Sequence, residues 1–153
     1  MVIYRITKAV YADRLVASGG EARWNGRGQF VIYMAATRAL ACLENVVHRS
    51  GEGLLGVFRV MVIDLPDDLA VETIAVDDLP ADWFDFHQYA TCQRLGGDWL
   101  RSGQSAVLRV PSAIIAQERN YLFNPAHPLF TRIRLLRTEP FAFDPRIKTG
   151  LDA

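Results

Sequence analysis

The sequence predicts an α+β fold, with a single compact domain over 1–153 in which helices flank a mixed sheet. Segments with strand-like and helix-like patterns follow one another without the regular strand–helix–strand alternation of a parallel sheet. The absence of a GxGxxG fingerprint after any expected strand disfavours a Rossmann sheet. Half of the 153 residues are hydrophobic, which is enough for one sizeable core.

Six segments have strand-like patterns rich in β-branched and aromatic residues. The segment 54–63 contains the longest apolar run, which is interrupted by Arg59 and is too short to cross a bilayer as a helix. It is therefore expected to be a central strand. The other expected strands cover 2–7, 30–35, 105–110, 120–123 and 131–143.

Three helices are expected, over 11–18, 37–50 and 83–101. Thr37 is the expected N-cap of the second helix. Its apolar stripe consists of Leu40, Leu43, Val46 and Val47. The acidic stretch 64–83 is expected to be a surface excursion without a catalytic role.

Composition narrows the classes of function. Seventeen basic and 17 acidic residues give a formal charge of zero, which removes the electrostatic basis for direct nucleic-acid binding and favours a small substrate or a protein partner. Cys42 and Cys92 belong to no CxxC or Cys/His cluster, so both are expected to be buried, reduced thiols in a cytoplasmic protein. The first residues lack the pattern of a signal peptide, and no membrane association is expected.

Three candidate site residues stand at near-equal intervals in different expected elements. Arg23 lies in a Gly/Asn-rich loop and offers a planar fork for phosphate or carboxylate, although it also fits a surface arginine. Tyr33 ends a β-branched run, where core packing is its default explanation. Glu44 lies beside the apolar stripe of the second helix, and partial burial of a carboxylate costs free energy unless it is paired or hydrogen-bonded. His48, four residues later, provides the simple alternative of an ion pair with Glu44.

Four strings of the chain, in order, resemble the RES domain family. They are GEARWNGRGQFVIYMAATRALACLENVVH, LGGDWL, VPSAIIAQERNYLFNPAHPLF and PFAFDPRI, which together span nearly the whole sequence. The resemblance implies a fold similar to that of the ADP-ribosyltransferases, which use NAD. It also implies the toxin half of a bacterial toxin–antitoxin pair.

The resemblance assigns the family's arginine, tyrosine, glutamate and serine to Arg23, Tyr33, Glu44 and Ser112. It further implies that Glu44, Tyr33 and Arg23 are catalytic. The residues implied to bind NAD are Arg5, Arg23, Tyr33, His48 and Ser112. The sequence VPSA around the serine also fits a strand-ending turn. The turn-and-strand scaffold is the favoured role of three further polar residues in the third string, Asn120, Asn124 and His127.

The activity implied by the resemblance is consumption of NAD by cleavage of the nicotinamide–ribose bond, with water or phosphate as acceptor, which arrests growth. The alternatives are an ADP-ribosyltransferase that modifies a cellular protein and a non-catalytic binding module. NAD enters as a substrate, and neither a cofactor nor a metal is implied. The implied partner is a cognate Xre-type antitoxin, with which the toxin forms a hetero-oligomer.

Overall fold

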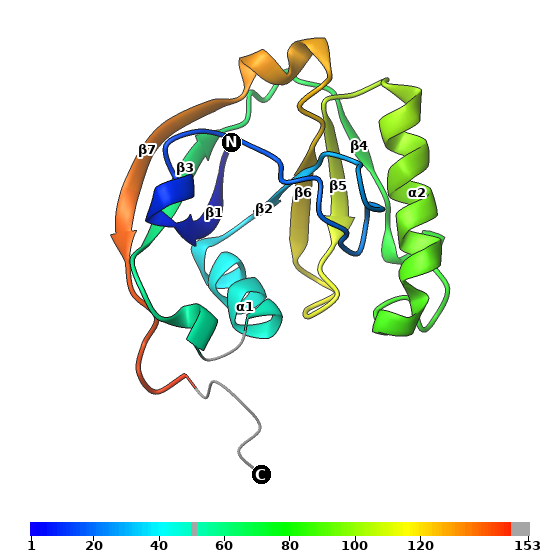
Figure 1. Ribbon diagram of the computed structural model, residues 1–153. Helices are drawn as coiled ribbons and strands as arrows, with labels where there is room; N and C mark the ends of the chain where they lie inside the picture. The colour runs from blue at the N-terminus through cyan, green and yellow to red at the C-terminus, as the bar shows by residue number, and fades with distance from the viewer. Residues whose placement is uncertain (50–51, 148–153) are drawn as a thin grey trace.

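In the computed structural model, which describes residues 1–49 and 52–147, seven strands form one sheet in the order β4-β5-β6-β2-β1-β3-β7 (Figure 1). Neighbouring strands are antiparallel except for β4 and β5, which are parallel, so the sheet is mixed as expected. The strands are β1 (Val2–Lys8), β2 (Ile32–Ala35), β3 (Phe58–Asp64), β4 (Val71–Thr73), β5 (Val107–Pro111), β6 (Arg119–Phe123) and β7 (Arg134–Phe141).

The two central strands β1 and β2 are only weakly paired. β1 pairs with β3 along its whole length, and β2 pairs with β6 over four residues. Between β1 and β2, by contrast, the register contains only the pair Tyr4 and Ala35. The two strands therefore diverge on either side of this contact, which leaves space in the middle of the sheet for a site.

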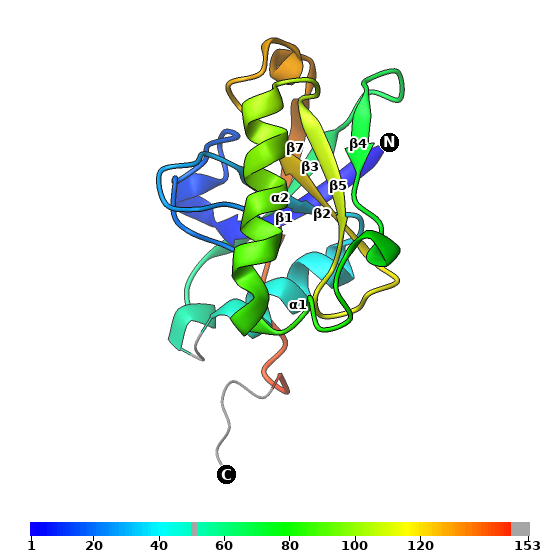
Figure 2. The ribbon, with the colours of Figure 1, turned by 90° about the vertical axis from the view of Figure 1, so that its right-hand side faces the viewer.

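Two α-helices, α1 (Arg38–His48) and α2 (Tyr89–Ser102), cover the same face of the sheet (Figures 1 and 2). Ile6, Ala35 and Val60 pack against the underside of α1, because alternate strand residues point to one face. Leu108 and Leu122 pack beneath α2 in the same way. The start of α1 is as predicted, since Thr37 has an extended backbone and its hydroxyl accepts a hydrogen bond from Leu40 N.

The opposite face of the sheet is covered mainly by irregular chain. Ile3, Met34, Ile63 and Phe123 point to this side and form a core with Ala12 and other apolar residues from connecting segments. Five short 3₁₀ helices lie in the described connections: η1 (Ala9–Tyr11), η2 (Glu52–Leu54), η3 (Val76–Asp78), η4 (Phe86–Gln88) and η5 (Pro128–Arg132).

The prediction of a helix over 11–18 is wrong. Only the 3₁₀ turn η1 forms, and the chain then runs without regular structure. A helix of eight residues has little intrinsic stability and depends on packing. Here Leu15 and Ala17 reach the core from a non-helical chain, while Val10 and Tyr11 remain exposed.

Other boundaries also differ. β3 begins at Phe58 rather than at 54, and the helix expected from 83 begins at Tyr89, because η4 precedes it with Asp85 accepting a hydrogen bond from His87 N. The acidic stretch contains the edge strand β4, which the sequence analysis missed. The end of the helix expected at 50 lies outside the described residues. Both cysteines are free; Cys92 is buried and Cys42 is half-buried, and burial raises both thiol pKa values.

Candidate functional site

A cavity of about 960 Å³ opens between α1, the beginning of α2 and the diverging strands β1 and β2. Five of the six predicted site residues line it: Arg5, Arg23, Tyr33, Glu44 and His48. The sixth, Ser112, lies directly behind Glu44. The divergence of β1 and β2 thus makes room for a cavity at which the candidate site residues gather.

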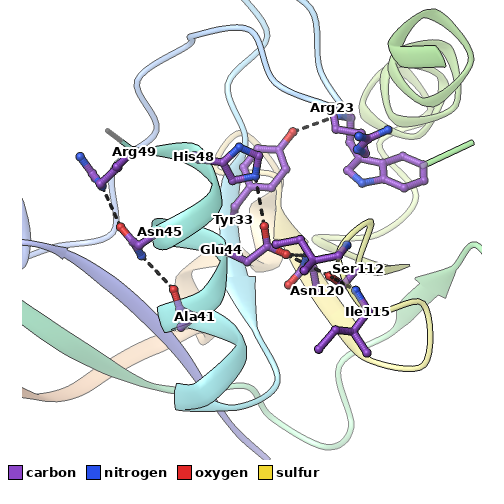
Figure 3. Close-up of polar contacts among 12 residues, drawn as sticks. Arg23, Tyr33, Ala41, Glu44, Asn45, His48, Arg49, Ser112, Ile115 and Asn120 are labelled. Atoms are coloured by element: carbon purple, nitrogen blue, oxygen red, sulfur yellow. Dashed lines mark hydrogen bonds and ion pairs between the residues drawn. The ribbon is translucent and has the colours of Figure 1, made fainter. Parts of the chain in front are cut away.

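The Glu44 carboxylate is contacted by three side chains (Figure 3). Asn120 Nδ2 donates to Glu44 Oε1 at 2.7 Å, and Ser112 Oγ donates to the same oxygen at 3.2 Å. His48 Nε2 lies 3.2 Å from the other oxygen, Oε2. The expected pair of Glu44 and His48 is therefore present, but it is one part of a larger set of contacts that comes from three elements.

These contacts decide the charge of Glu44, whose side chain is only 23% exposed. Burial on its own raises a carboxyl pKa, because it disfavours the charged form. Hydrogen bonds from His48, Asn120 and Ser112 oppose that effect, and the net result is a pKa below the ordinary glutamate value. The cavity thus presents a fixed carboxylate that is negatively charged at neutral pH.

Tyr33 extends from β2 into the wall of the cavity, and its hydroxyl group is fully used by the neighbouring loop. Tyr33 Oη donates to Asn25 Oδ1 at 2.5 Å and accepts from Trp24 N at 3.2 Å. Burial raises the pKa of Tyr33, so the phenol is neutral and remains a donor. Tyr33 therefore anchors the loop that carries Arg23.

Arg23 contacts the backbone of the segment that precedes α2. Its Nη1 donates to Trp83 O at 2.8 Å, its Nη2 donates to Phe84 O at 2.9 Å, and its guanidinium lies 4.6 Å from the centre of the Tyr89 ring. Phe84 and Phe86 are exposed at the cavity wall. Arg23 thus has a structural function in addition to its position in the cavity, and a contact with an anionic substrate stays a prediction.

Ser112 is completely buried and does not line the cavity. Its hydroxyl accepts hydrogen bonds from Ile114 N and Ile115 N while donating to Glu44. The serine therefore shapes the turn after β5, as one of the two roles considered for VPSA requires, and it also holds the glutamate, a role that was not expected. Its binding of NAD stays a prediction.

Asn120 belongs to strand β6, as the scaffold role implies, but it also lines the cavity and donates a hydrogen bond to Glu44, which was not expected. The available signal was its type, since asparagine is uncommon within strands. The scaffold role holds for the other two: Asn124 Oδ1 accepts from Ala126 N, and His127 Nδ1 accepts from Leu129 N.

Two further residues line the same cavity but were not among the predicted site residues: Asn45, which follows Glu44 in α1, and Arg49, the C-cap of the helix. Within the described ranges 1–49 and 52–147, His, Cys, Asp and Glu side chains form no group of three or more that could hold a metal ion. None of the helices in these ranges is long and apolar enough to span a membrane.

The sequence of this chain is similar to those of several known toxins. The chain is 36% identical over 141 residues to the Prs ADP-ribosylating toxin of Sphingobium sp. (strain YBL2), an alignment that covers 89% of this chain and 88% of the relative. It is 35% identical over 153 residues to Toxin Res of Yersinia enterocolitica serotype O:8 / biotype 1B, covering 97% of this chain and all of the relative.

Solved structures show the same fold. A chain of the M. tuberculosis MbcT-MbcA toxin–antitoxin complex superimposes with a TM-score of 0.75 at 19% identity, covering 92% of this chain and 84% of that one. The expected fold class, one compact α+β domain with a mixed sheet and flanking helices, is confirmed, and this chain shares its fold with that toxin–antitoxin structure. The model of the RES domain matches residues 2–144, and the chain therefore belongs to the RES domain family.

Proposed function

We propose that this protein is the toxin of a bacterial toxin–antitoxin pair and that it cleaves the bond between nicotinamide and ribose in NAD, with water or phosphate as acceptor. The observation that carries the proposal is the Glu44 carboxylate, which three side chains hold charged at the wall of a large cavity. The names of the curated relatives support the toxin assignment.

Glu44 supplies what this reaction needs. When the bond between ribose C1′ and the nicotinamide nitrogen breaks, the electron pair leaves with nicotinamide, which becomes neutral and requires no proton. Positive charge develops on the ribose ring, as in other glycosidic cleavages. A carboxylate fixed in advance stabilises this charge without reorganisation, and it can also accept a hydrogen bond from a ribose hydroxyl.

The acceptor completes the reaction by forming a new bond to C1′. Water gives ADP-ribose and releases one proton, whereas phosphate attacks through one of its oxygens and gives a phosphorylated ADP-ribose. In this proposal the Tyr33 ring orients the nicotinamide from the cavity wall. Arg23 orders the segment that carries Phe84 and contributes positive charge to the binding of the diphosphate.

A second candidate is transfer of ADP-ribose to a cellular protein. It is favoured by the 36% identical relative that is named an ADP-ribosylating toxin. Both candidates use the same bond cleavage and differ only in the acceptor. The third possibility, a non-catalytic binding module, does not account for a buried carboxylate kept charged inside the cavity.

Incubation of the purified protein with NAD, followed by identification of the products, tests the proposal. We expect release of nicotinamide with ADP-ribose or its phosphorylated form. Glu44→Gln, which keeps the shape and removes the charge, is the matched control and should lower turnover by about a hundredfold or more. Nicotinamide release only when a protein acceptor is added would favour the transferase, and near-normal turnover by a folded Glu44→Gln protein would exclude the proposed role of Glu44.

The toxin assignment is tested in cells. Expression of the protein alone should arrest bacterial growth and lower the NAD pool, and Glu44→Gln should do neither. Co-expression of an Xre-type antitoxin encoded beside it should reverse both effects and yield a hetero-oligomer. Normal growth at high levels of the wild-type protein would contradict the assignment, and arrest at constant NAD would favour a protein target.

A further inference from the structure

A second functional feature lies next to Glu44 on α1. Glu44 and His48 are four residues apart and share one line along the helix. Asn45 lies on the adjacent line, and Arg49, the C-cap that follows the helix, donates to it. All four residues line the cavity. Arg5, which enters from β1, lines it as well, so two guanidinium groups from different elements line the cavity that holds the carboxylate.

Neither guanidinium group is neutralised by the described side chains. Arg49 Nε donates to Asn45 Oδ1 at 2.8 Å, and its guanidinium lies 5.5 Å from the centre of the Phe58 ring. Arg5 makes one long contact, from Nη1 to Val16 O at 3.5 Å. No carboxylate of the described side chains lies within ion-pair distance of either one.

The proximity of the two arginines has an energetic consequence. Burial and the charge of Arg49 both lower the pKa of Arg5, which means that the folded protein disfavours the positive charge at this position. Two like charges in a partly enclosed site destabilise each other unless an anion lies between them. The position of Arg49 at the C-terminus of α1, where a positive charge is favourable, explains this one cation. It does not explain why Arg5 lies close by.

Asn45 fixes this arrangement. Its Nδ2 donates to Ala41 O at 2.9 Å, and its Oδ1 accepts from Arg49 (Figure 3). Nδ2 also donates to Ile6 O at 3.1 Å, so both amide hydrogens are used. The same side chain therefore ties α1 to β1 and orients Arg49. Such preorganisation lowers the entropic cost of binding a ligand.

We propose that Arg49, with Asn45 as its positioning residue, joins Arg5, which the family resemblance already implies to bind NAD, in an oxyanion subsite for a phosphate group. This inference rests on the proposed function, in which the phosphate belongs either to the diphosphate of NAD or to free phosphate that acts as acceptor. Arg23 is less available for this role, because its Nη atoms bind the Trp83 and Phe84 carbonyl oxygens. Arginine forks match the geometry of phosphate oxygens.

The test compares Arg49→Ala with the wild-type protein. Arg94→Ala is the matched control, because it removes the same charge from an exposed residue of α2 that does not line the cavity. If the subsite holds the diphosphate, Arg49→Ala should raise KM for NAD about tenfold or more. If it holds the acceptor, KM for phosphate should rise by the same factor while KM for NAD stays unchanged.

Arg49→Lys should recover part of the loss, because it restores the charge without the fork. If Arg49→Ala fails to fold, as judged by its melting curve, Arg49→Lys and Arg49→Gln replace it in the same assays. If KM for NAD and KM for phosphate both stay unchanged in a folded variant, the proposed subsite is overturned.

A direct binding measurement separates this inference from the proposed function. Pyrophosphate and inorganic phosphate are titrated into the wild-type protein and the variants by calorimetry. Binding that is lost in Arg49→Ala and kept in Arg94→Ala would support the subsite even if the wild-type protein released no nicotinamide. Equal binding by all three proteins, or binding by none of them, would overturn the subsite and leave the role of Glu44 to its own test.

Discussion

Asn120 Nδ2 donates a 2.7 Å hydrogen bond to Glu44 Oε1, joining β6 to a helix residue 76 positions earlier in the chain. Within the described part of the chain, the other end of this amide, Asn120 Oδ1, is buried without a hydrogen-bond partner. A buried acceptor without a partner costs free energy, so the protein tolerates this cost to keep the amide directed at Glu44. The Asn120 contact is one of three that keep the proposed catalytic carboxylate charged and in position.

Asn120→Ala is expected to raise the pKa of Glu44. Burial continues to raise this pKa, while one of the hydrogen bonds that lower it is removed. In the wild-type protein the carboxylate stays charged until the pH falls below the ordinary glutamate value. In the variant it becomes protonated at a higher pH, so the acidic limb of kcat/KM for NAD should move to higher pH.

Asn124→Ala is the control for this experiment, because Asn124 caps a turn and does not line the cavity. The Glu44 carboxylate also contributes to the free energy of unfolding. Because its pKa is lowered in the folded protein, this contribution is fully present above the pKa of the unfolded state and is lost as the pH falls through the pKa of the folded state. An acidic limb at the same pH in Asn120→Ala and in the wild-type protein would contradict the assignment.

Arg23→Ala is expected to loosen the segment 83–88 as well as to weaken NAD binding. The guanidinium group binds the carbonyl oxygens of Trp83 and Phe84, and a lysine ammonium cannot reproduce this fork. Hydrogen–deuterium exchange should therefore become faster at 83–88 in both Arg23→Ala and Arg23→Lys. The loss of stability should be about 1 to 2 kcal/mol.

Arg27→Ala provides the comparison, because it removes an exposed arginine from the same loop. Unchanged exchange at 83–88, together with a higher KM for NAD, would make Arg23 a ligand residue without the structural role.

Tyr33→Phe is expected to destabilise the protein by about 1 to 3 kcal/mol, because it leaves Asn25 Oδ1 unsatisfied at a position that is 1% exposed. The ring remains in the cavity wall, so the effect reports the hydroxyl group alone. Urea unfolding measures the change, with Tyr11→Phe as a control at an exposed tyrosine. Equal midpoints for Tyr33→Phe and the wild-type protein would show that the loop does not need this anchor.

Gly96→Ala is expected to separate α2 from the loop that carries Arg23. A Cβ atom at Gly96 would lie 1.8 Å from the Trp24 carbonyl oxygen, and a backbone atom cannot move aside as the end of a side chain can. We expect a loss of about 3 kcal/mol or more, at the upper end of the usual cost of overpacking. Urea unfolding of this variant and of Gly97→Ala makes the comparison.

Gly97 is a close control, because the nearest atoms to its Cβ position are the flexible ends of Gln29 and Arg101. Alanine there should cost little, and it gains about 1 kcal/mol of helix propensity over glycine. Similar stabilities of the two variants would contradict direct packing of α2 on the loop backbone.

Local features were predictable from the sequence because they depend on residues that are close together in the chain. The Thr37 cap and the pairing of Glu44 with His48 follow from spacings of three and four residues on a helix. The pattern of β-branched residues likewise indicated the strands other than β4, and the four strings indicated the family and its fold. Neighbouring residues also indicated that Glu44 is partly buried, but not what keeps it charged.

Only the tertiary structure decided which distant groups meet. Ser112 and Asn120 reach Glu44 because β6 lies beside β2 and β5 lies beside β6 in the sheet, an order that no local pattern specifies. The same holds for Arg23, whose partners lie about 60 residues further along the chain. Segments of weak intrinsic preference, such as 11–18 and the short strand β4, take the conformation that their packing and pairing allow.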